Sequence, residues 1–417
     1  MPEGPDGYDF FHSEECDLCG DCLARCQYMD LTQSEAVEEM KRLIAGEPTR
    51  TVHRKCISCY ACNAFCPRGC HPYELIIGTW HQRYRDKGLP VRASYLMPAS
   101  SPNFRTDIVK NMSAGERELL RQWRETPPQG EVVLYPGCSV LTLPHLLDAA
   151  FMRDVPVHGD FDLCCGEMYF RMGLFDVVEK VAEKLTAYYR DSDIGTMLFV
   201  CPAGINMFRN VLPREFGAEF GFEIKYIGNY LLEKVESGEI EIKRKLDRSV
   251  AVHDSCHGRI LGDEIMETAR KLYSLMGLEM REMEHNREEG YCCGFAAGCN
   301  RFNPTDMFKA SAKELWESQK TGAKEMAIYC TACQTTFTMY RWLFPTLQPV
   351  RHLLEYFKEA TEGTAYYPAQ RRSLHMLKNI AVKAFPQILS RKTYRIEIAK
   401  TLKVELPRPF GKGNQGI

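Results

Sequence analysis

Residues 250–256 read VAVHDSC, residues 291–294 read YCCG, and residues 326–333 read MAIYCTAC. Corresponding segments occur earlier in the chain, about 120 to 130 residues before these, and this spacing indicates an internal duplication. The earlier segments are VVLYPGC at 132–138, CCG at 164–166 and MLFVC at 197–201.

Each copy alternates short apolar stretches with amphipathic ones. In the first copy, 177–189 has helical periodicity and 197–200 favours a strand; in the second, 306–320 and 326–329 correspond to them. This alternation predicts parallel α/β layers. Because cysteines follow the predicted strands, we expect them at the C-terminal ends of the strands, where open α/β sheets bind ligands.

The two copies differ in their cysteine content. The second copy has five cysteines in the pattern C-x35-CC-x36-C-x2-C, whereas Gly204 takes the fifth position in the first copy. Either the first copy still holds a further cluster, or it is a relic that supports the fold and shapes the wall of the site; we favour the relic. The cysteines are Cys138, Cys164, Cys165 and Cys201 in the first copy, and Cys256, Cys292, Cys293, Cys330 and Cys333 in the second.

Two more cysteine runs lie near the N-terminus, each with the spacing C-x2-C-x2-C-x3-C. In two-cluster ferredoxins, three thiolates of such a run bind one cubane [4Fe–4S] cluster and the fourth binds the other. Structural zinc is the alternative, but two complete four-cysteine runs favour clusters. We predict one cluster on Cys16, Cys19, Cys22 and Cys66, and a second on Cys56, Cys59, Cys62 and Cys26.

The segments between the cysteines suggest a domain order. Thr32 and Glu35 form a capping-box pattern that begins a helix ending near Ile44. The expected fold class is α/β with an N-terminal all-α module for two [4Fe–4S] clusters, followed by two pseudo-symmetric α/β halves. The predicted parts are a helical ferredoxin-like domain at 1–86, a linker at 87–130 with one helix at 115–125, the first half at 131–248, the second half at 249–362 and a basic tail at 363–417.

The five-cysteine pattern and the two ferredoxin runs together resemble the CCG-domain family of heterodisulfide reductases and related iron–sulfur oxidoreductases. The likeness covers residues 10–360, and the order is similar to that of the D-type subunits, in which B-like and C-like parts are fused. It implies a non-cubane [4Fe–4S] cluster in the second half, at which a disulfide is cleaved, with Cys292 and Cys293 as catalytic residues. The implied ligands are Cys256, Cys292, Cys293, Cys330 and Cys333.

Two histidines, His253 and His257, flank Cys256 and are further candidate catalytic residues. They could supply protons to the leaving thiolates. They could instead hydrogen-bond the cluster sulfurs and tune the potential, and we give this second role slightly more weight. The two remaining cysteines, Cys70 and Cys299, fit no ligand position, and we expect them to be packing residues.

The composition restricts the class of protein. The net charge of −2 gives no whole-chain attraction to nucleic acid. No basic and apolar leader precedes the first run, and no apolar stretch reaches the ~20 residues that span a bilayer. We therefore expect a cytoplasmic protein, with attachment to the cytoplasmic face of the membrane through a partner subunit as a further option.

The C-terminal tail has the opposite charge from the rest of the chain. Residues 366–417 contain eleven Lys or Arg and two acidic residues, a net charge of +9. Residues 374–389 have apolar residues at helical spacing that Pro386 is expected to break. The tail is either a docking element for a partner or an anionic lipid surface, or an ordinary solvated helix with a frayed end.

The leading functional hypothesis is an oxidoreductase subunit that passes electrons from the ferredoxin-type clusters to the non-cubane site, where a disulfide is reduced or thiols are oxidised. Its expected partners are a membrane cytochrome b-like subunit, a flavoprotein or another iron–sulfur subunit. The alternative is a pure electron relay from a flavin-dependent dehydrogenase or electron-transfer flavoprotein towards quinone.

Overall fold

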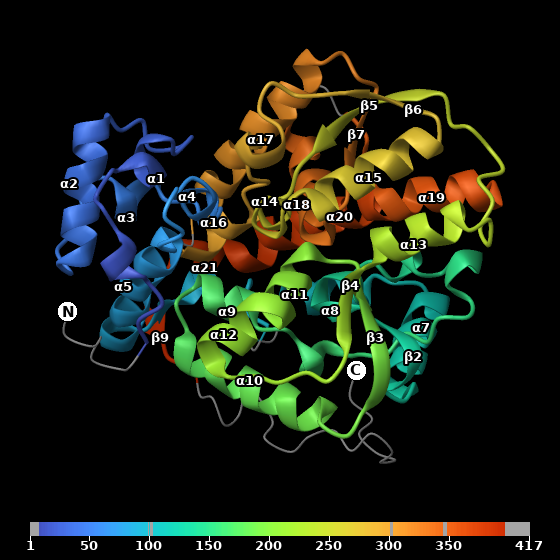
Figure 1. Ribbon diagram of the computed structural model, residues 1–417, viewed down its shortest axis with the longest axis horizontal. Helices are drawn as coiled ribbons and strands as arrows, with labels where there is room; N and C mark the ends of the chain where they lie inside the picture. Colours follow the sequence, from blue (N-terminus) through green and yellow to red (C-terminus); the bar gives the residue numbers. More distant parts are fainter. Residues whose placement is uncertain (1–7, 99, 101–102, 301–302, 345–347, 397–417) are drawn as a thin grey trace.

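Two parallel sheets form the centre of the molecule (Figure 1). The computed structural model describes residues 8–98, 100, 103–300, 303–344 and 348–396. Both sheets confirm the parallel α/β layers that were predicted from the alternation of apolar and amphipathic stretches. The strands are β2 (Gln129–Tyr135), β3 (Asp193–Phe199) and β4 (Glu223–Tyr226) in one sheet, and β5 (Arg248–His253), β6 (Leu278–Arg281), β7 (Glu325–Ile328) and β8 (Val350–His352) in the other.

The two sheets have similar strand orders. The first has the order β2-β3-β4 and the second β6-β5-β7-β8, and all of these neighbours are parallel. Val157 forms a parallel bridge with Leu134 of β2, at the position that β6 takes beside β5. A shared order of this kind is expected from an internal duplication.

Helices cover the faces of both sheets and give two α/β bodies (Figure 1). The helices of the first body are α8 (Gly137–Val140), α9 (Glu167–Arg171), α10 (Phe175–Tyr189), α11 (Pro202–Asn206), α12 (Leu212–Phe216) and α13 (Ile227–Glu236). Those of the second body are α14 (Cys256–Leu261), α15 (Asp263–Leu275), α16 (Phe295–Asn300), α17 (Pro304–Lys320), α18 (Thr331–Tyr340) and α19 (Leu353–Glu362).

A helical module at the N-terminus packs beside both bodies, in blue in Figure 1. Its helix α2 begins with the predicted capping box, in which the Glu35 N–H donates to Thr32 Oγ1 (3.4 Å) and the Thr32 N–H donates to the Glu35 carboxylate (2.9 Å). The module consists of α1 (Asp21–Ala24), α2 (Gln33–Ile44), α3 (Val52–Lys55), α4 (Ala61–Ala64) and α5 (Pro72–Lys87).

One buried carboxylate of α2 fixes the start of α3. Glu39 accepts the backbone N–H groups of Arg50, Thr51 and Val52 at 2.9, 2.8 and 3.0 Å. Burial opposes the charge of Glu39, but these hydrogen bonds outweigh it and lower the pKa of its carboxyl. The carboxylate therefore satisfies free N–H groups at a helix N-terminus and holds the loop that leads to Cys56.

The segment 87–130 has more structure than its composition predicted. The helix expected at 115–125 is present as α7 (Ala114–Glu125), but a second helix, α6 (Phe104–Lys110), precedes it. Asn103 caps α6 by accepting two backbone N–H groups. Short strand β1 (Leu89–Pro90) pairs with β9 (Thr393–Tyr394), so the segment also contacts the C-terminal part of the chain.

Pro386 does not break the helix, so the break expected from the sequence is wrong. A helix runs from α20 (Ala369–Asn379) through a π-helical turn (Ile380–Ala384) into α21 (Phe385–Leu389). Pro386 directly follows the π-helical turn, and such single-turn bulges occur within α-helices without ending them.

This part of the tail is folded onto the body of the protein. The Ser373 hydroxyl donates to the Thr338 carbonyl of α18 (2.8 Å), and Arg372 pairs with Glu116 of α7. Residues 397–417 of the predicted tail lie outside the described residues. Within the described part of the chain, no helix combines the length and the apolar character that crossing a bilayer needs.

Replacing Glu39 tests how the module is held together. We expect Glu39→Gln to lower the free energy of unfolding of the module by about 2 kcal/mol, because charge-assisted hydrogen bonds at a helix N-terminus are lost. Since the folded pKa is lowered, this stabilisation is present above the ordinary carboxyl pKa and is lost as the pH falls through the folded pKa. Urea unfolding and amide exchange of residues 50–52 measure it.

The matched control is Glu38→Gln on the same helix, where an exposed carboxylate pairs with Lys41. It should change stability by less than about 0.5 kcal/mol. Equal effects of the two substitutions would contradict the role given to Glu39.

Candidate functional site

The two N-terminal cysteine runs have the same backbone shape. In each run the residues on either side of the second cysteine have positive φ angles, which are Leu18 (58°) and Gly20 (82°) in the first run and Ser58 (62°) and Tyr60 (59°) in the second. This conformation costs about 1–2 kcal/mol for residues other than glycine. Helices α1 and α4 begin directly after these turns. Strained backbone repeated at equivalent positions is typical of functional sites.

The structure gathers the eight cysteines of these runs into two groups. The pKa of Cys22 is raised by burial and then by three neighbouring thiol groups, those of Cys66, Cys19 and Cys16. The second group lines a cavity of about 320 Å³. Its cysteines are Cys26, Cys56, Cys59 and Cys62. Cys70, which we expected to be a packing residue, is buried, and its N–H donates to Cys66 Sγ at 3.4 Å.

The paired cysteines of each α/β body are followed by a glycine in the left-handed conformation. The φ angles of Gly166 and Gly294 are 83° and 84°. A Cβ added at Gly294 would lie 2.5 Å from the Met307 carbonyl oxygen of α17, and one at Gly166 would lie 3.2 Å from Val181 of α10. Glycine is therefore needed for the turn, and at Gly294 also for the close approach of the backbone.

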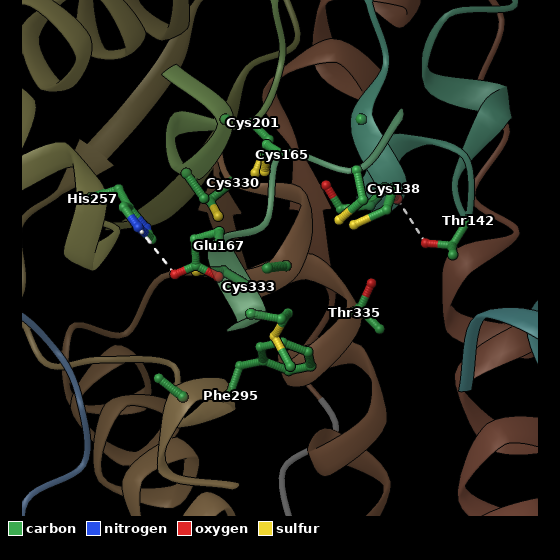
Figure 2. A pocket seen from close by; sticks show the side chains of 18 of the residues that line it. Cys138, Thr142, Cys165, Glu167, Cys201, His257, Phe295, Cys330, Cys333 and Thr335 are labelled. Carbon is green, nitrogen blue, oxygen red and sulfur yellow. Dashed lines mark hydrogen bonds and ion pairs between the residues drawn. The ribbon is translucent and has the colours of Figure 1, made fainter. Parts of the chain in front are cut away.

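The cysteines of both bodies meet in one cavity (Figure 2). Cys138, Cys201, Cys256 and Cys330 each follow the C-terminal end of a parallel strand, as the sequence predicted. The cavity lies between the two bodies and is lined by residues of both. Nine cysteines line it, namely Cys138, Cys164, Cys165, Cys201, Cys256, Cys292, Cys293, Cys330 and Cys333.

Thiol contacts run through the second body in the order Cys256, Cys292, Cys293, Cys333, Cys330. Hydrogen bonds from Cys292 and Cys333 lower the pKa of Cys293 to about 6. These five thiols are buried, and each contacts the next in the series. Thiolates this close together repel one another unless cations neutralise them, so the set is suited to bind a metal centre.

The first body has a shorter series of contacts. Cys164 hydrogen-bonds both Cys138 and Cys165. Cys201 hydrogen-bonds Cys330 of the second body, so the two cysteine sets touch at this point. Gly204, at the position of the absent fifth cysteine, also lines the cavity.

His253 lies behind one of these cysteines. Its Nε2 is 3.3 Å from Cys333 Sγ, and its Nδ1 is 2.5 Å from Glu314 Oε1. Burial disfavours the charged imidazole, but Glu314 outweighs burial and raises the pKa of His253. His253 is not among the described residues that line the cavity, whereas His257 is. Glu314 was not predicted from the sequence. The one indication of its role is that a charged residue lies on the buried face of an amphipathic helix.

Arg171 connects the N-terminal module with both bodies. It ends α9 of the first body, and its Nη1 donates to the Ser58 carbonyl of the second cysteine run. Its Nη2 lies 3.3 Å from Cys256 Sγ and 3.1 Å from His257 Nε2. Burial favours a neutral carboxyl at Glu167, but Arg171 and His257 lower its pKa to about 2. Figure 2 shows the contact between His257 and Glu167. Residues far apart in the sequence make these contacts, and no motif indicates them.

A second contact joins the module to the paired cysteines. The Cys292 N–H donates to the hydroxyl of Tyr28, at 3.0 Å. Tyr28 lies two residues after Cys26 of the second ferredoxin group. The Lys313 ammonium donates to the Gln27 carbonyl (2.9 Å) and lies 5.1 Å from the centre of the Tyr28 ring. The second ferredoxin group is therefore held directly against the cavity.

Arg259 is a buried cation at the same junction. Burial lowers its pKa, but the thiolates of Cys59, Cys256 and Cys292 outweigh burial and raise it. Its Nη2 donates to the Gly290 carbonyl, and its Nε and Nη1 have no hydrogen-bond partner among the described atoms. None of the ion pairs between described residues includes Arg259. A buried guanidinium without a carboxylate is expensive, so its environment fits an anionic centre such as a thiolate cluster.

Comparisons with known proteins agree with this arrangement. Residues 250–338 match the CCG cysteine-rich domain family. The chain is 25% identical over 181 residues to a protein of Methanosarcina acetivorans named as the D subunit of dihydromethanophenazine:CoB–CoM heterodisulfide reductase. This alignment covers 42% of the chain and 44% of that protein.

Longer alignments have lower identity. A protein of the same name from Methanosarcina mazei is 22% identical over 327 residues, 73% of this chain and 74% of that protein. A protein of Syntrophomonas wolfei named EtfAB:quinone oxidoreductase is 22% identical over 308 residues, 66% of this chain but 41% of its own length. The chain thus spans less than half of the first and third of these relatives.

These names support a redox role and bound iron–sulfur clusters for the chain. The packing role expected for Cys299 stays a prediction, because its side chain lies outside the described residues. The chain carries a CCG cysteine-rich domain and is homologous, at modest identity, to proteins named as D subunits of heterodisulfide reductase.

Proposed function

We propose that the chain is an iron–sulfur oxidoreductase subunit that reduces a disulfide, or oxidises two thiols, in the cavity between its two α/β halves. The observation that carries this proposal is the complete five-cysteine set, which lines a cavity shared by both halves. His257 lines the same cavity and can exchange protons, which a protein that only relays electrons does not need.

The cysteine groups fit iron–sulfur clusters by the chemistry of their donors. The two groups of the N-terminal module would hold cubane [4Fe–4S] clusters, and the complete set of the second half would hold a non-cubane one. The buried cations Arg171 and Arg259 support this assignment, because they lie beside thiols that are anionic when they bind metal. We also propose the domain boundaries predicted from the sequence, with the N-terminal module at 1–86, the first half at 131–248 and the second half at 249–362.

The proposed reaction is R–S–S–R′ + 2 e⁻ + 2 H⁺ → RSH + R′SH. When bound, the clusters supply single electrons that together break the S–S bond. The chain itself has to bind the disulfide, exclude water and provide protons. His257 is the histidine placed to exchange a proton with a bound thiol, because it lines the cavity and Glu167 holds its ring. His253 acts from outside the cavity, where its Nε2 contacts Cys333 Sγ and Glu314 fixes its orientation.

The first half would shape the wall of the cavity. Its residues Met168 and Phe199 line the space with apolar surface, and Arg105 of the preceding segment, whose Nη2 is 3.5 Å from Cys138 Sγ, adds a cation. Alternatively, the four cysteines of this half hold a further cluster. Iron analysis distinguishes these two alternatives. The redox partner would be a membrane cytochrome b-like subunit, a flavoprotein or another iron–sulfur subunit, in line with the names of the relatives.

A pure electron relay towards quinone is the second candidate function. It is favoured by the similarity to a protein named EtfAB:quinone oxidoreductase and by the incomplete cysteine set of the first half. The two candidates differ in one respect, because only the first requires a thiol or disulfide to bind beside the clusters.

Iron analysis with EPR spectroscopy of anaerobically purified protein distinguishes them. We expect about twelve irons per chain, four for each of three clusters. Oxidation in the presence of a thiol should produce a paramagnetic signal that is absent without it. The signal should disappear in Cys292→Ala, which should lose about four irons and keep the two ferredoxin clusters. The matched control is Cys70→Ala, which removes a buried cysteine outside both groups.

Each other result has a defined meaning. About twelve irons without any response to thiols would favour the relay. About sixteen irons would show that the first half also holds a cluster, and about eight would mean that the second half holds none.

A charge substitution tests the electrostatic role of Arg259. A buried positive charge stabilises the reduced, more negative form of a nearby cluster, so Arg259→Met should lower the cluster potentials. At an effective dielectric constant of ~20 and a distance of ~6 Å, the shift is on the order of 100 mV. Potentiometric titration followed by EPR measures it. Arg121→Met, which removes a half-exposed arginine of α7 paired with Glu118, is the control and should leave the potentials within a fifth of that shift.

A further inference from the structure

The exposed apolar side chains of the protein are gathered around its last helices. Of the seven large hydrophobic side chains that are exposed among the described residues, five lie between residues 366 and 389. They are Tyr366, Leu374, Val382, Phe385 and Leu389, and the other two are Trp316 and Leu343. Scattered single residues of this kind are normal on a protein surface, but a concentration in one place marks an interaction site.

The apolar residues follow the outer face of the α20–α21 helix. The inner face is buried through Ala369, Ser373 and Met376. The outer face would be polar on an ordinary surface helix. Here Val382 and Leu389 are 68% and 67% exposed. At 1.5 Å per residue, the exposed residues from 374 to 389 extend over roughly 20 Å.

Leu343 adjoins the start of this helix, because the indole N–H of the neighbouring Trp342 donates to the Gln370 carbonyl at 3.1 Å. Trp316 lies on α17, where its ring packs against Phe344 with 6.2 Å between ring centroids. We call the outer face of α20–α21 together with Leu343 the apolar face.

Positive charges border the apolar face, and acidic residues are missing from its sequence. Residues 363–396 contain no Asp or Glu. Arg371 and Lys378 are exposed near α20, and Arg391 and Lys392 follow α21 directly. The ion pairs among the residues that the structure describes include none of these four cations.

We propose that the apolar face binds the surface of an anionic lipid bilayer. A helix with an exposed apolar side and flanking Lys or Arg lies in the plane of such a surface, with its apolar residues below the headgroups and its cations beside the phosphates. An exposed aromatic residue such as Phe385 suits the interface between headgroups and acyl chains. Each cation near an anionic surface contributes about a fivefold increase in affinity.

An anionic bilayer fits better than an acidic protein for one reason. Residues 363–396 combine exposed apolar side chains with cations and contain no acidic residue, which is the composition of helices that lie in the interface of an anionic bilayer. The proposal is independent of the redox chemistry. It describes binding to the surface of a membrane, which needs no membrane-crossing helix, and none is found among the described residues.

Vesicle flotation of the full-length holoprotein tests the proposal. The protein should float with vesicles of phosphatidylcholine mixed with phosphatidylglycerol, it should float less with phosphatidylcholine alone, and added salt should weaken binding. Phe385→Ser combined with Leu389→Ser should weaken binding by roughly tenfold or more. Arg391→Gln combined with Lys392→Gln should weaken it by about fivefold for each cation removed.

The control is Lys41→Gln combined with Arg42→Gln, which removes two adjacent cations from α2 and should leave binding unchanged. Iron content and circular dichroism confirm that each variant is folded. The proposal is wrong if the protein does not bind the anionic vesicles, or if the serine variant binds as well as the wild type. It is also wrong if the apolar face instead mediates self-association, which analytical ultracentrifugation would show as a dimer that the serine variant abolishes.

Discussion

The structure depends on one constraint, which is that many thiols have to be buried next to one another. Nine cysteines line one cavity, and four more line a second cavity in the module beside it. Free thiolates at this density repel one another, and burial disfavours each charge further. The fold answers with buried cations, since Arg171 contacts Cys256 and Arg259 adjoins the cysteines. The parallel strands serve the same end, because they deliver their cysteines to a common edge.

The features that could be predicted from the sequence are local ones. The capping box of α2, helices α10 and α17, and the strands that precede the cysteines follow from spacing and periodicity over a few residues. The two ferredoxin-type groups also came from spacing alone, and the structure brings their cysteines together, although the bound clusters stay a prediction. Gly166 and Gly294 show why the CCG pattern is readable, since both residues must adopt the left-handed conformation.

The features that the sequence did not reveal depend on distant contacts. Glu314, Arg171 and Tyr28 reach the cysteines from other elements, across up to 264 positions in the case of Tyr28 and Cys292. Periodicity gives no information about such pairs. The break expected at Pro386 was wrong for another reason, because a π-helical turn accommodates the proline and keeps the helix in one piece.

The contacts of Arg171 have a consequence for the biogenesis of the protein. One side chain from the first body touches a loop of the N-terminal module and a cysteine of the second body, so these three parts close on one another together. In the closed arrangement, Cys256 and Cys292 at the junction are 7% and 1% exposed. Folding of the three parts and filling of this junction are therefore coupled, because each part supplies groups that surround the same thiols.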